Sequence, residues 1–168
     1  MERPLRVSRE QFKIIMSATA QHDPAAAEPG LNVGIDMVSI ARIRESLAAF
    51  PDRFVRRIYS TREAEYAMSS PAHCASRLAA RFAAKEAAIK ALRLAESAVC
   101  WRDIEVERAA SGECSLRLHG PVQAKAAADG VYSVSLSMSH EDDCAIAIVI
   151  ARSQTGSRTA RVATDANG

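Results

Sequence analysis

Two acids and two lysines in this sequence have the types and spacing to hold a divalent cation against phosphate groups. Glu86 and Lys90 stand four residues apart in the alanine-rich segment 81–90, so they share one face of the helix that this composition predicts. Asp36 interrupts a short run of Val and Ile residues, where an acid is unusual. If Asp36 and Glu86 meet across a strand–helix interface, their carboxylates would suit Mg²⁺, which proteins hold with one or two carboxylates plus substrate phosphates.

Lys85 and Lys90 are the candidate phosphate contacts, because either ammonium group would neutralise phosphate oxygens that the metal does not reach. The same residues also fit a plain structural interpretation. Glu86 with Lys90 has the spacing of an ordinary surface pair, worth about 0.3–0.5 kcal/mol. Arg81 with Lys85 repeats this spacing on a neighbouring face of the helix. Asp36 would then be a half-exposed acid at the end of a strand, placed to cap the next helix.

The elements expected around these residues are typical of an α+β fold with a mostly antiparallel sheet. Strands are predicted where Val, Ile and alternating polar residues occur, and helices where apolar residues recur at three- and four-residue intervals. The first strand carries Asp36, and the longest helix carries the acid and both lysines. The expected order is a strand within 31–40, helical segments at 40–50 and 52–59, a helix from the capping box Ser60–Glu63, the long helix at 72–95, a hairpin at 101–120, a helix at 121–129 and a hairpin at 132–151.

Composition and charge predict one globular domain. The net charge of +2 over 168 residues is too small to indicate a nucleic acid partner, and the four cysteines have no metal-ligand spacing. Apolar runs shorter than about 18 residues exclude a membrane-spanning helix. The charged first twenty residues lack a signal-peptide core, so a cytoplasmic protein is expected. We expect the domain at 31–151, an N-terminal extension and linker at 1–30, and a disordered tail at 152–168.

Five short motifs follow one another along the chain. They are "VGID" at 33–36, "RFAAKEAAIK" at 81–90, "WRDIEV" at 101–106, "LHG" at 118–120 and "SMSH" at 137–140. Their order and spacing resemble one known family, the 4′-phosphopantetheinyl transferases, in its short holo-acyl-carrier-protein synthase branch. The resemblance extends from about 32 to 151 and implies that family's fold, a mostly antiparallel sheet packed against a long helix in one trimer-forming domain.

The resemblance implies that coenzyme A donates its 4′-phosphopantetheine arm to a serine of an apo acyl carrier protein, with release of 3′,5′-ADP. Asp36 and Glu86 would bind Mg²⁺ on the diphosphate, and Lys90 would complete the catalytic set at the phosphate. The resemblance leaves open whether Glu86 or a metal-bound water takes the serine proton. His140, by its position in a turn, is either a solvated surface residue or a phosphate donor. The implied coenzyme A contacts are Lys85, Lys90, Ser139 and His140.

The same resemblance implies two kinds of protein partner, whereas the composition predicts no nucleic acid or membrane partner. One is a carrier protein with an acidic recognition helix, which would dock on Arg42, Arg44, Arg53 and Phe54, although these arginines also fit ordinary surface charges. The other is the chain itself, as a homotrimer with the coenzyme cleft between neighbouring subunits. Carrier proteins of fatty acid, lipid A or polyketide synthesis all fit as the acceptor.

The chain also departs from the family pattern. The family has a Gly-Thr-Gly turn after the KExxxKA motif, whereas this chain has "LRLAES", with Arg93 as an alternative phosphate contact. The acids 141–143 follow His140 and would repel a polyanionic coenzyme unless they point away. These differences leave an alternative function, a catalytically degenerate module that only binds a carrier protein or coenzyme A.

Overall fold

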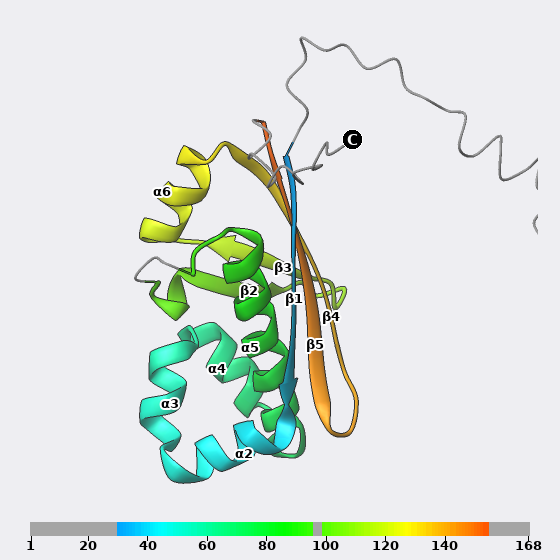
Figure 1. Ribbon diagram of the computed structural model, residues 1–168. Helices are drawn as coiled ribbons and strands as arrows, with labels where there is room; N and C mark the ends of the chain where they lie inside the picture. Colours follow the sequence, from blue (N-terminus) through cyan, green and yellow to red (C-terminus); the bar gives the residue numbers. More distant parts are fainter. Residues whose placement is uncertain (1–29, 96–98, 155–168) are drawn as a thin grey trace, which may run out of the picture.

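The computed structural model describes residues 30–95 and 99–154, which form a three-stranded sheet, a long helix against it and smaller elements at its sides (Figure 1). Gly30 begins the first described strand and Ser153 ends the last. The predicted extension and tail otherwise lie almost wholly outside the described residues. The strands are β1 (Gly30–Ser39), β2 (Ile104–Arg108), β3 (Cys114–Leu118), β4 (Val131–His140) and β5 (Cys144–Ser153). The helices are α2 (Ile40–Ala49), α3 (Pro51–Ile58), α4 (Thr61–Met68), α5 (Cys74–Ala91) and α6 (Gly120–Ala128), with 3₁₀ turns η1 (Pro71–His73) and η2 (Trp101–Asp103).

Both predicted hairpins are confirmed, and they belong to separate sheets. Strands β2 and β3 form a two-stranded antiparallel sheet. Strands β4 and β5 pair through the turn at 141–143, and β1 pairs antiparallel with the other edge of β5, which gives the order β1-β5-β4. The predicted α+β class with antiparallel pairing is therefore confirmed.

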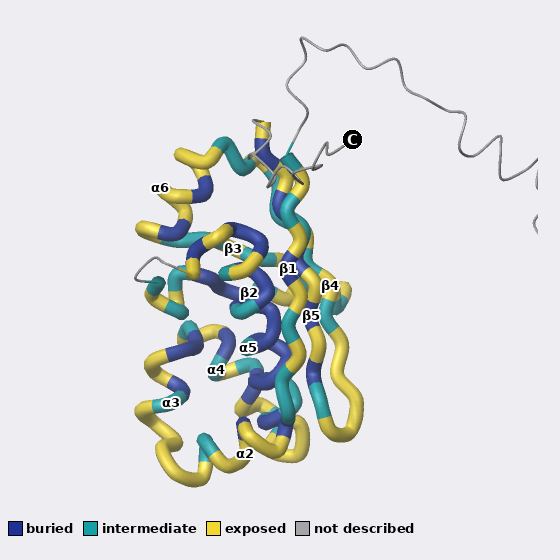
Figure 2. Tube along the Cα trace, in the orientation of Figure 1, coloured by how far each residue is buried: buried dark blue, intermediate teal, exposed yellow. Residues whose placement is uncertain are grey.

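Helix α5 packs against the three-stranded sheet, and its alanines allow the two backbones to come close. Figure 2 shows this helix as mostly buried, whereas α2 and α3 are largely exposed. The fully buried alanines on α5 are Ala79, Ala83, Ala84, Ala87, Ala88 and Ala91. Where β1 crosses the helix, a Cβ atom added to Gly34 would lie 2.0 Å from the carbonyl oxygen of Ala87 and 2.7 Å from the amide nitrogen of Ala91. Only glycine fits this crossing, which explains the Gly beside Asp36 in "VGID".

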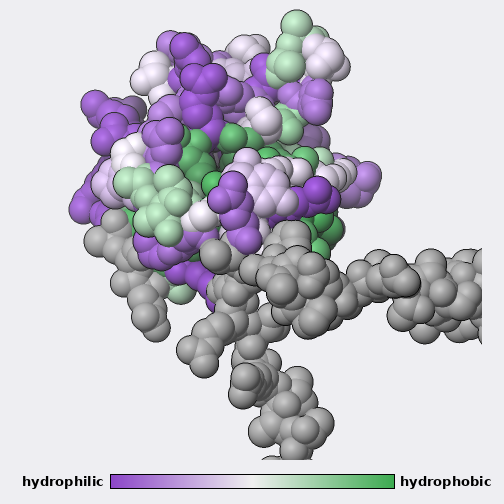
Figure 3. Space-filling view, turned by 90° about the horizontal axis from the view of Figure 1, so that it is seen from above, coloured by the Kyte–Doolittle hydropathy of each residue, from purple (hydrophilic) through white to green (hydrophobic). Residues whose placement is uncertain are grey.

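The opposite face of the sheet is exposed, and it is apolar along β1 and β5. The predicted alternation in β1 is confirmed, but Gly34 and Asp36 are on the side of α5 and the large apolar residues are on the outside. Across the ladder, Ile35 is paired with Ile148 and Met37 with Ile146, so the apolar side chains of two strands are contiguous. Seven of the nine exposed large hydrophobic residues in the described ranges lie in these three strands. By contrast, the end of the molecule seen in Figure 3 has a mostly hydrophilic rim. Large exposed apolar patches are typical of interaction surfaces.

The long helix is shorter than the sequence predicted, because its C-terminus has a complete Schellman cap. The Leu94 amide donates to the carbonyl of Ile89 (2.9 Å) and the Arg93 amide to that of Lys90 (3.2 Å). Arg93 has φ = 55° there, a left-handed conformation usually taken by glycine. The turn is therefore formed although the family's glycines are absent from the sequence.

Replacing Arg93 by glycine should raise the free energy of unfolding by about 1 kcal/mol. The left-handed conformation costs a residue with a Cβ atom about 1–2 kcal/mol, of which the greater chain entropy of glycine cancels a part. Urea denaturation of Arg93→Gly and Arg93→Ala separates this effect from loss of the guanidinium, because alanine keeps the Cβ atom. Equal stability of the two variants would contradict the assignment of strain at Arg93.

Candidate active site

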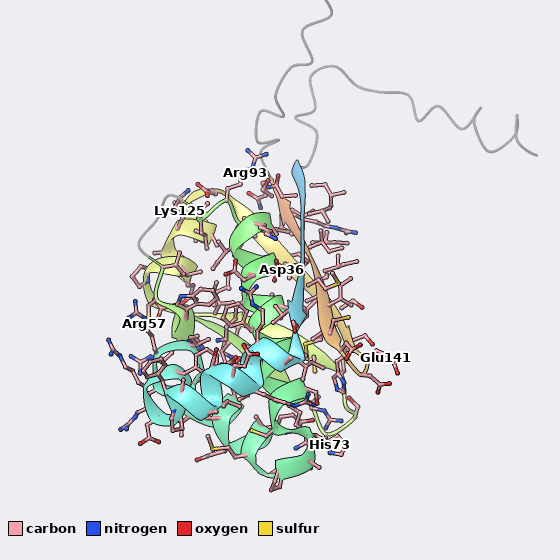
Figure 4. The ribbon with its side chains drawn as sticks, turned by 60° about the horizontal axis from the view of Figure 1, so that its bottom comes forward. Asp36, Arg57, His73, Arg93, Lys125 and Glu141 are labelled. Atoms are coloured by element: carbon pink, nitrogen blue, oxygen red, sulfur yellow. The ribbon has the colours of Figure 1, made fainter. Side chains whose placement is uncertain are left out.

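Asp36, Glu86 and Lys90 meet where β1 crosses α5. The Lys90 Nζ atom lies 2.8 Å from Oδ1 of Asp36 and donates to the carbonyl of Ile35 at 2.9 Å. In Figure 4, Asp36 lies between the strand and the helix. Glu86 stands one helical turn before Lys90, and the Asp36 carboxylate is close enough to act on its ionisation. The structure thus brings together the three residues predicted as the catalytic set.

A groove of about 680 Å³ opens beside these carboxylates. Asp36 and Glu86 line it together with the predicted docking residues Arg42 and Phe54. Phe82, one turn before Glu86 on α5, forms another part of the wall. One cavity therefore has carboxylates, a cation and aromatic surface in contact with solvent, which is the usual composition of a ligand site.

The Glu86 carboxyl is harder to ionise than an ordinary glutamate. Burial and, next, the negative charge of Asp36 raise its pKa above the usual 4.5, and the Lys90 ammonium opposes this only in part. The two carboxylates together carry one more negative charge than that single ammonium neutralises. A divalent cation between them would remove the repulsion, so the electrostatics of the groove favour a metal.

The donor set fits Mg²⁺ better than a metal that needs a complete protein cage. No group of three or more His, Cys, Asp or Glu residues that could hold a metal ion occurs within residues 30–95 and 99–154. A cation held by Asp36 and Glu86 would need its remaining ligands from water or from phosphate oxygens. Magnesium keeps several waters and commonly combines one or two carboxylates with substrate phosphates.

Mg²⁺ should stabilise the protein more at about pH 8 than at about pH 5. Because folding raises the pKa of Glu86, its protonated form contributes stability below 4.5, and this contribution is lost as the pH rises through the folded pKa. At neutral pH the repulsion between the two carboxylates destabilises the folded protein, and a bound cation would remove this repulsion. At low pH protons would displace the cation. Thermal unfolding with and without Mg²⁺ measures this difference. A Mg²⁺ effect that is equal at both pH values would contradict the assignment.

The structure corrects the prediction that Lys85 contacts phosphate. Its side chain is fully buried, and its Nζ atom lies 2.9 Å from Oε2 of Glu63 on α4. The same ammonium donates to the carbonyl oxygens of Trp101 (3.0 Å) and Ile104. Helical spacing could not reveal this, because the acid that buries Lys85 lies on another helix.

Ser139 and His140 are exposed at the end of β4 and do not line the groove of Asp36 and Glu86. They line a second cavity of about 320 Å³, whose walls contain three arginines that lie over one tyrosine ring. The arginines are Arg77, Arg81 and Arg108, which sequence reasoning did not assign to a site. Their guanidinium carbons lie 4.5, 4.4 and 5.5 Å, respectively, from the centre of the Tyr66 ring.

Arg81 makes this second cavity a candidate anion site. The residue is 2% exposed, and its Nε atom is buried without a hydrogen-bond partner. Burial lowers the pKa of its guanidinium, which the negative charge of Glu63 partly offsets. An anion in the cavity would compensate the clustered positive charge. The spacing of Arg77 and Arg81 along one helix face is the sequence signal that could have indicated it.

The sequence model of the 4′-phosphopantetheinyl transferase superfamily matches residues 32–149. The holo-[acyl-carrier-protein] synthase of Koribacter versatilis is 42% identical over 121 residues, which cover 71% of this chain and 96% of that protein. The chain belongs to the 4′-phosphopantetheinyl transferase superfamily. Two solved synthases have the same fold. The Chronobacterium ammoniagenes complex with CoA has 32% identity, a TM-score of 0.65 and coverage of 74% of this chain and 98% of that one. The Helicobacter pylori complex with coenzyme A has 31% identity, a TM-score of 0.62 and coverage of 71% and 98%.

The predicted docking residues of this transferase family member divide between the groove and the outer surface. Arg42 and Phe54 line the groove, whereas Arg44 and Arg53 are exposed on α2 and α3 without lining it. Arg57, which was not predicted, also points outward from α3 (Figure 4). The basic surface therefore continues from the carboxylates along two helices.

The acidic turn between β4 and β5 is exposed to solvent. Residues 141–143 are all exposed, and Glu141 points outward in Figure 4. The carbonyl of Asp143 accepts a hydrogen bond from the Ile40 amide (2.9 Å), which fixes the turn to the start of α2. The turn is thus held by its backbone while its carboxylates face solvent, where their repulsion is screened.

Proposed function

We propose that this chain is a Mg²⁺-dependent holo-acyl-carrier-protein synthase that transfers 4′-phosphopantetheine from coenzyme A to a serine of an apo acyl carrier protein and releases 3′,5′-ADP. The proposal rests on the groove that Asp36 and Glu86 share with Arg42 and Phe54, together with the contact of Lys90 with Asp36. The named relatives and the coenzyme A complexes of two solved synthases agree with it.

The groove carboxylates and Lys90 would divide the work on the diphosphate between them. Asp36 and Glu86 would hold Mg²⁺, which would supply positive charge at the phosphate under attack. The half-exposed Lys90 ammonium is already oriented by Asp36 and Ile35, so it can contact the same phosphate without first being ordered. Glu86 is the candidate acceptor of the serine proton, because burial and the charge of Asp36 raise its pKa.

A homotrimer would bring the separate phosphate-binding elements together. Ser139 and His140 lie in a different cavity from the carboxylates, so a neighbouring subunit would place its arginine-rich cavity beside this groove. The exposed apolar face of β1 and β5 is a surface suited to such an assembly. Sedimentation of the full chain should give a trimer, and an active monomer would contradict this assembly.

The acceptor would be an acidic carrier protein in the cytoplasm. Exposed arginines on α2 and α3 border the groove, and complementary charge would speed the encounter and orient the acceptor serine. No helix in the described part of the chain is long and apolar enough to cross a bilayer.

Intact-mass spectrometry tests the transfer. Apo carrier proteins from the same organism are incubated with coenzyme A and Mg²⁺, and the expected result is a gain of one phosphopantetheine per carrier that chelation of the metal prevents. Binding of carrier or coenzyme without any mass gain across the panel would instead support the degenerate binding module. The formed cap at Arg93 removes one motive for that alternative, because the turn exists without glycine.

A further inference from the structure

Lys85 precedes Glu86 in the chain, but its side chain leaves the helix in another direction and ends in the protein interior. Successive residues of a helix differ by about 100° around its axis, so the orientation of one fixes the orientation of the other. The three N–H donors of the ammonium have three partners: the carboxylate of Glu63 and the carbonyls of Trp101 and Ile104. These partners belong to α4, η2 and β2, so Lys85 joins α5 to three other elements.

Glu63 is as firmly held as the lysine. Its Oε2 atom accepts the Ser60 amide (2.8 Å) in the capping box that begins α4, and its Oε1 atom accepts the Val106 amide (3.0 Å) of β2. Its side chain is fully buried. The Glu63–Lys85 pair is therefore a buried ion pair whose side-chain orientations are fixed by hydrogen bonds, beside an apolar core.

The contact of α5 with β1 does little to define the rotation of the helix. It is made through Gly34, Ala87 and Ala91, which lack the long side chains that interlock between packed elements. Phe82 adds a directional contact with η2, since its ring stacks on Trp101 with centroids 5.0 Å apart and an angle of 26°. The ammonium of Lys85 bonds the carbonyl of that same tryptophan, so two contacts tie η2 to the part of α5 that lines the groove.

We propose that Lys85 is a positioning residue that sets the rotation of α5, and thereby the placement of Glu86 opposite Asp36, through Glu63 and the carbonyls of Trp101 and Ile104. The inference rests on the proposed function for its kinetic consequence. Stability alone does not account for the pair, because a buried ion pair can often be replaced by neutral residues of similar volume without loss of stability. The ion pair instead fixes how the two side chains are oriented, which a neutral replacement would not do.

The double variant Glu63→Gln/Lys85→Met tests this proposal, because it removes both charges and keeps similar volumes. We expect a folded protein whose kcat is lowered about tenfold and whose half-saturating Mg²⁺ concentration is raised, with the KM for the carrier protein unchanged. In the metal-free protein, acrylamide should quench Trp101, the chain's single tryptophan, more readily. Lys125→Met is the matched control, since it removes a lysine from the exposed pair with Asp129.

The milder variant Glu63→Gln keeps the experiment decisive if the double variant does not fold. It retains an acceptor oxygen and the shape of the side chain, and it should change kcat and the Mg²⁺ requirement in the same direction by a smaller factor. A folded variant with a lowered unfolding temperature but wild-type kcat and Mg²⁺ dependence would show a purely structural pair and overturn the proposal. If the wild-type protein transfers nothing, the proposed function fails. The placement of Glu86 is then still tested by comparing the Mg²⁺-induced rise in unfolding temperature between the wild type and the variant.

Discussion

Glu86→Gln should lower the rate of phosphopantetheine transfer by at least about a hundredfold while the protein stays folded. Removing one preorganised electrostatic contact at a reacting centre typically costs a factor of this size. The amide has the shape of the carboxylate but is a poor ligand for a hard cation, so Mg²⁺ would lose one of its two protein ligands. Intact-mass measurement of the carrier protein at several Mg²⁺ concentrations gives the rate.

The same substitution should stabilise the metal-free protein at neutral pH. Burial and the charge of Asp36 raise the pKa of Glu86, so the ionised carboxylate is held at a cost that glutamine removes. The rise in unfolding temperature that Mg²⁺ gives the wild type should vanish. Glu65→Gln, at an exposed acid on α4, is the control and should keep both transfer and the Mg²⁺ effect. Near-wild-type turnover of Glu86→Gln would show that Glu86 is not a metal ligand.

Gly34→Ala should damage both stability and transfer, although it adds a single methyl group away from the reacting atoms. The new Cβ atom would meet the backbone of α5 at 2.0 and 2.7 Å, so strand and helix must separate. Overpacking of this kind costs about 1–3 kcal/mol or more. Because Asp36 is on the strand and Glu86 on the helix, a displacement of about 1 Å should lower transfer about a hundredfold.

The obstacle at Gly34 is backbone, which provides a specific control. If a side chain caused the clash, Ala87→Gly would relieve it, but the close contacts are to the carbonyl oxygen of Ala87 and the amide nitrogen of Ala91. Gly34→Ala/Ala87→Gly should therefore be no more active than Gly34→Ala alone. Ser137→Ala, on the exposed face of β4, measures the effect of a harmless strand substitution. Recovery of transfer in the double variant would contradict a backbone contact.

The sequence was sufficient for residues whose neighbours are set by local periodicity or by motif. Asp36 and Glu86 lie far apart in the chain, but the strand and helix that carry them were each recognisable, and the structure places both in one groove. The capping box at Ser60–Glu63 and the two hairpins were also confirmed.

The sequence was insufficient where burial depends on a distant partner. Lys85 and Glu86 are adjacent and equally polar in the sequence, and only the arrival of Glu63 from α4 makes one of them interior. Likewise, alternation in β1 defined two faces without showing that the apolar one is outside. Ser139 and His140 were predicted to contact the coenzyme, but one chain alone does not join their cavity to the groove.

Anomalous diffraction from crystals of the protein with coenzyme A and Mn²⁺ tests the central claim most directly, because Mn²⁺ prefers the same oxygen ligands as Mg²⁺ and can be located by its own signal. The account predicts one metal peak bonded to both the Asp36 and Glu86 carboxylates and to a phosphate oxygen of the coenzyme. A metal held by the phosphates alone, with either carboxylate outside coordination distance, would contradict it.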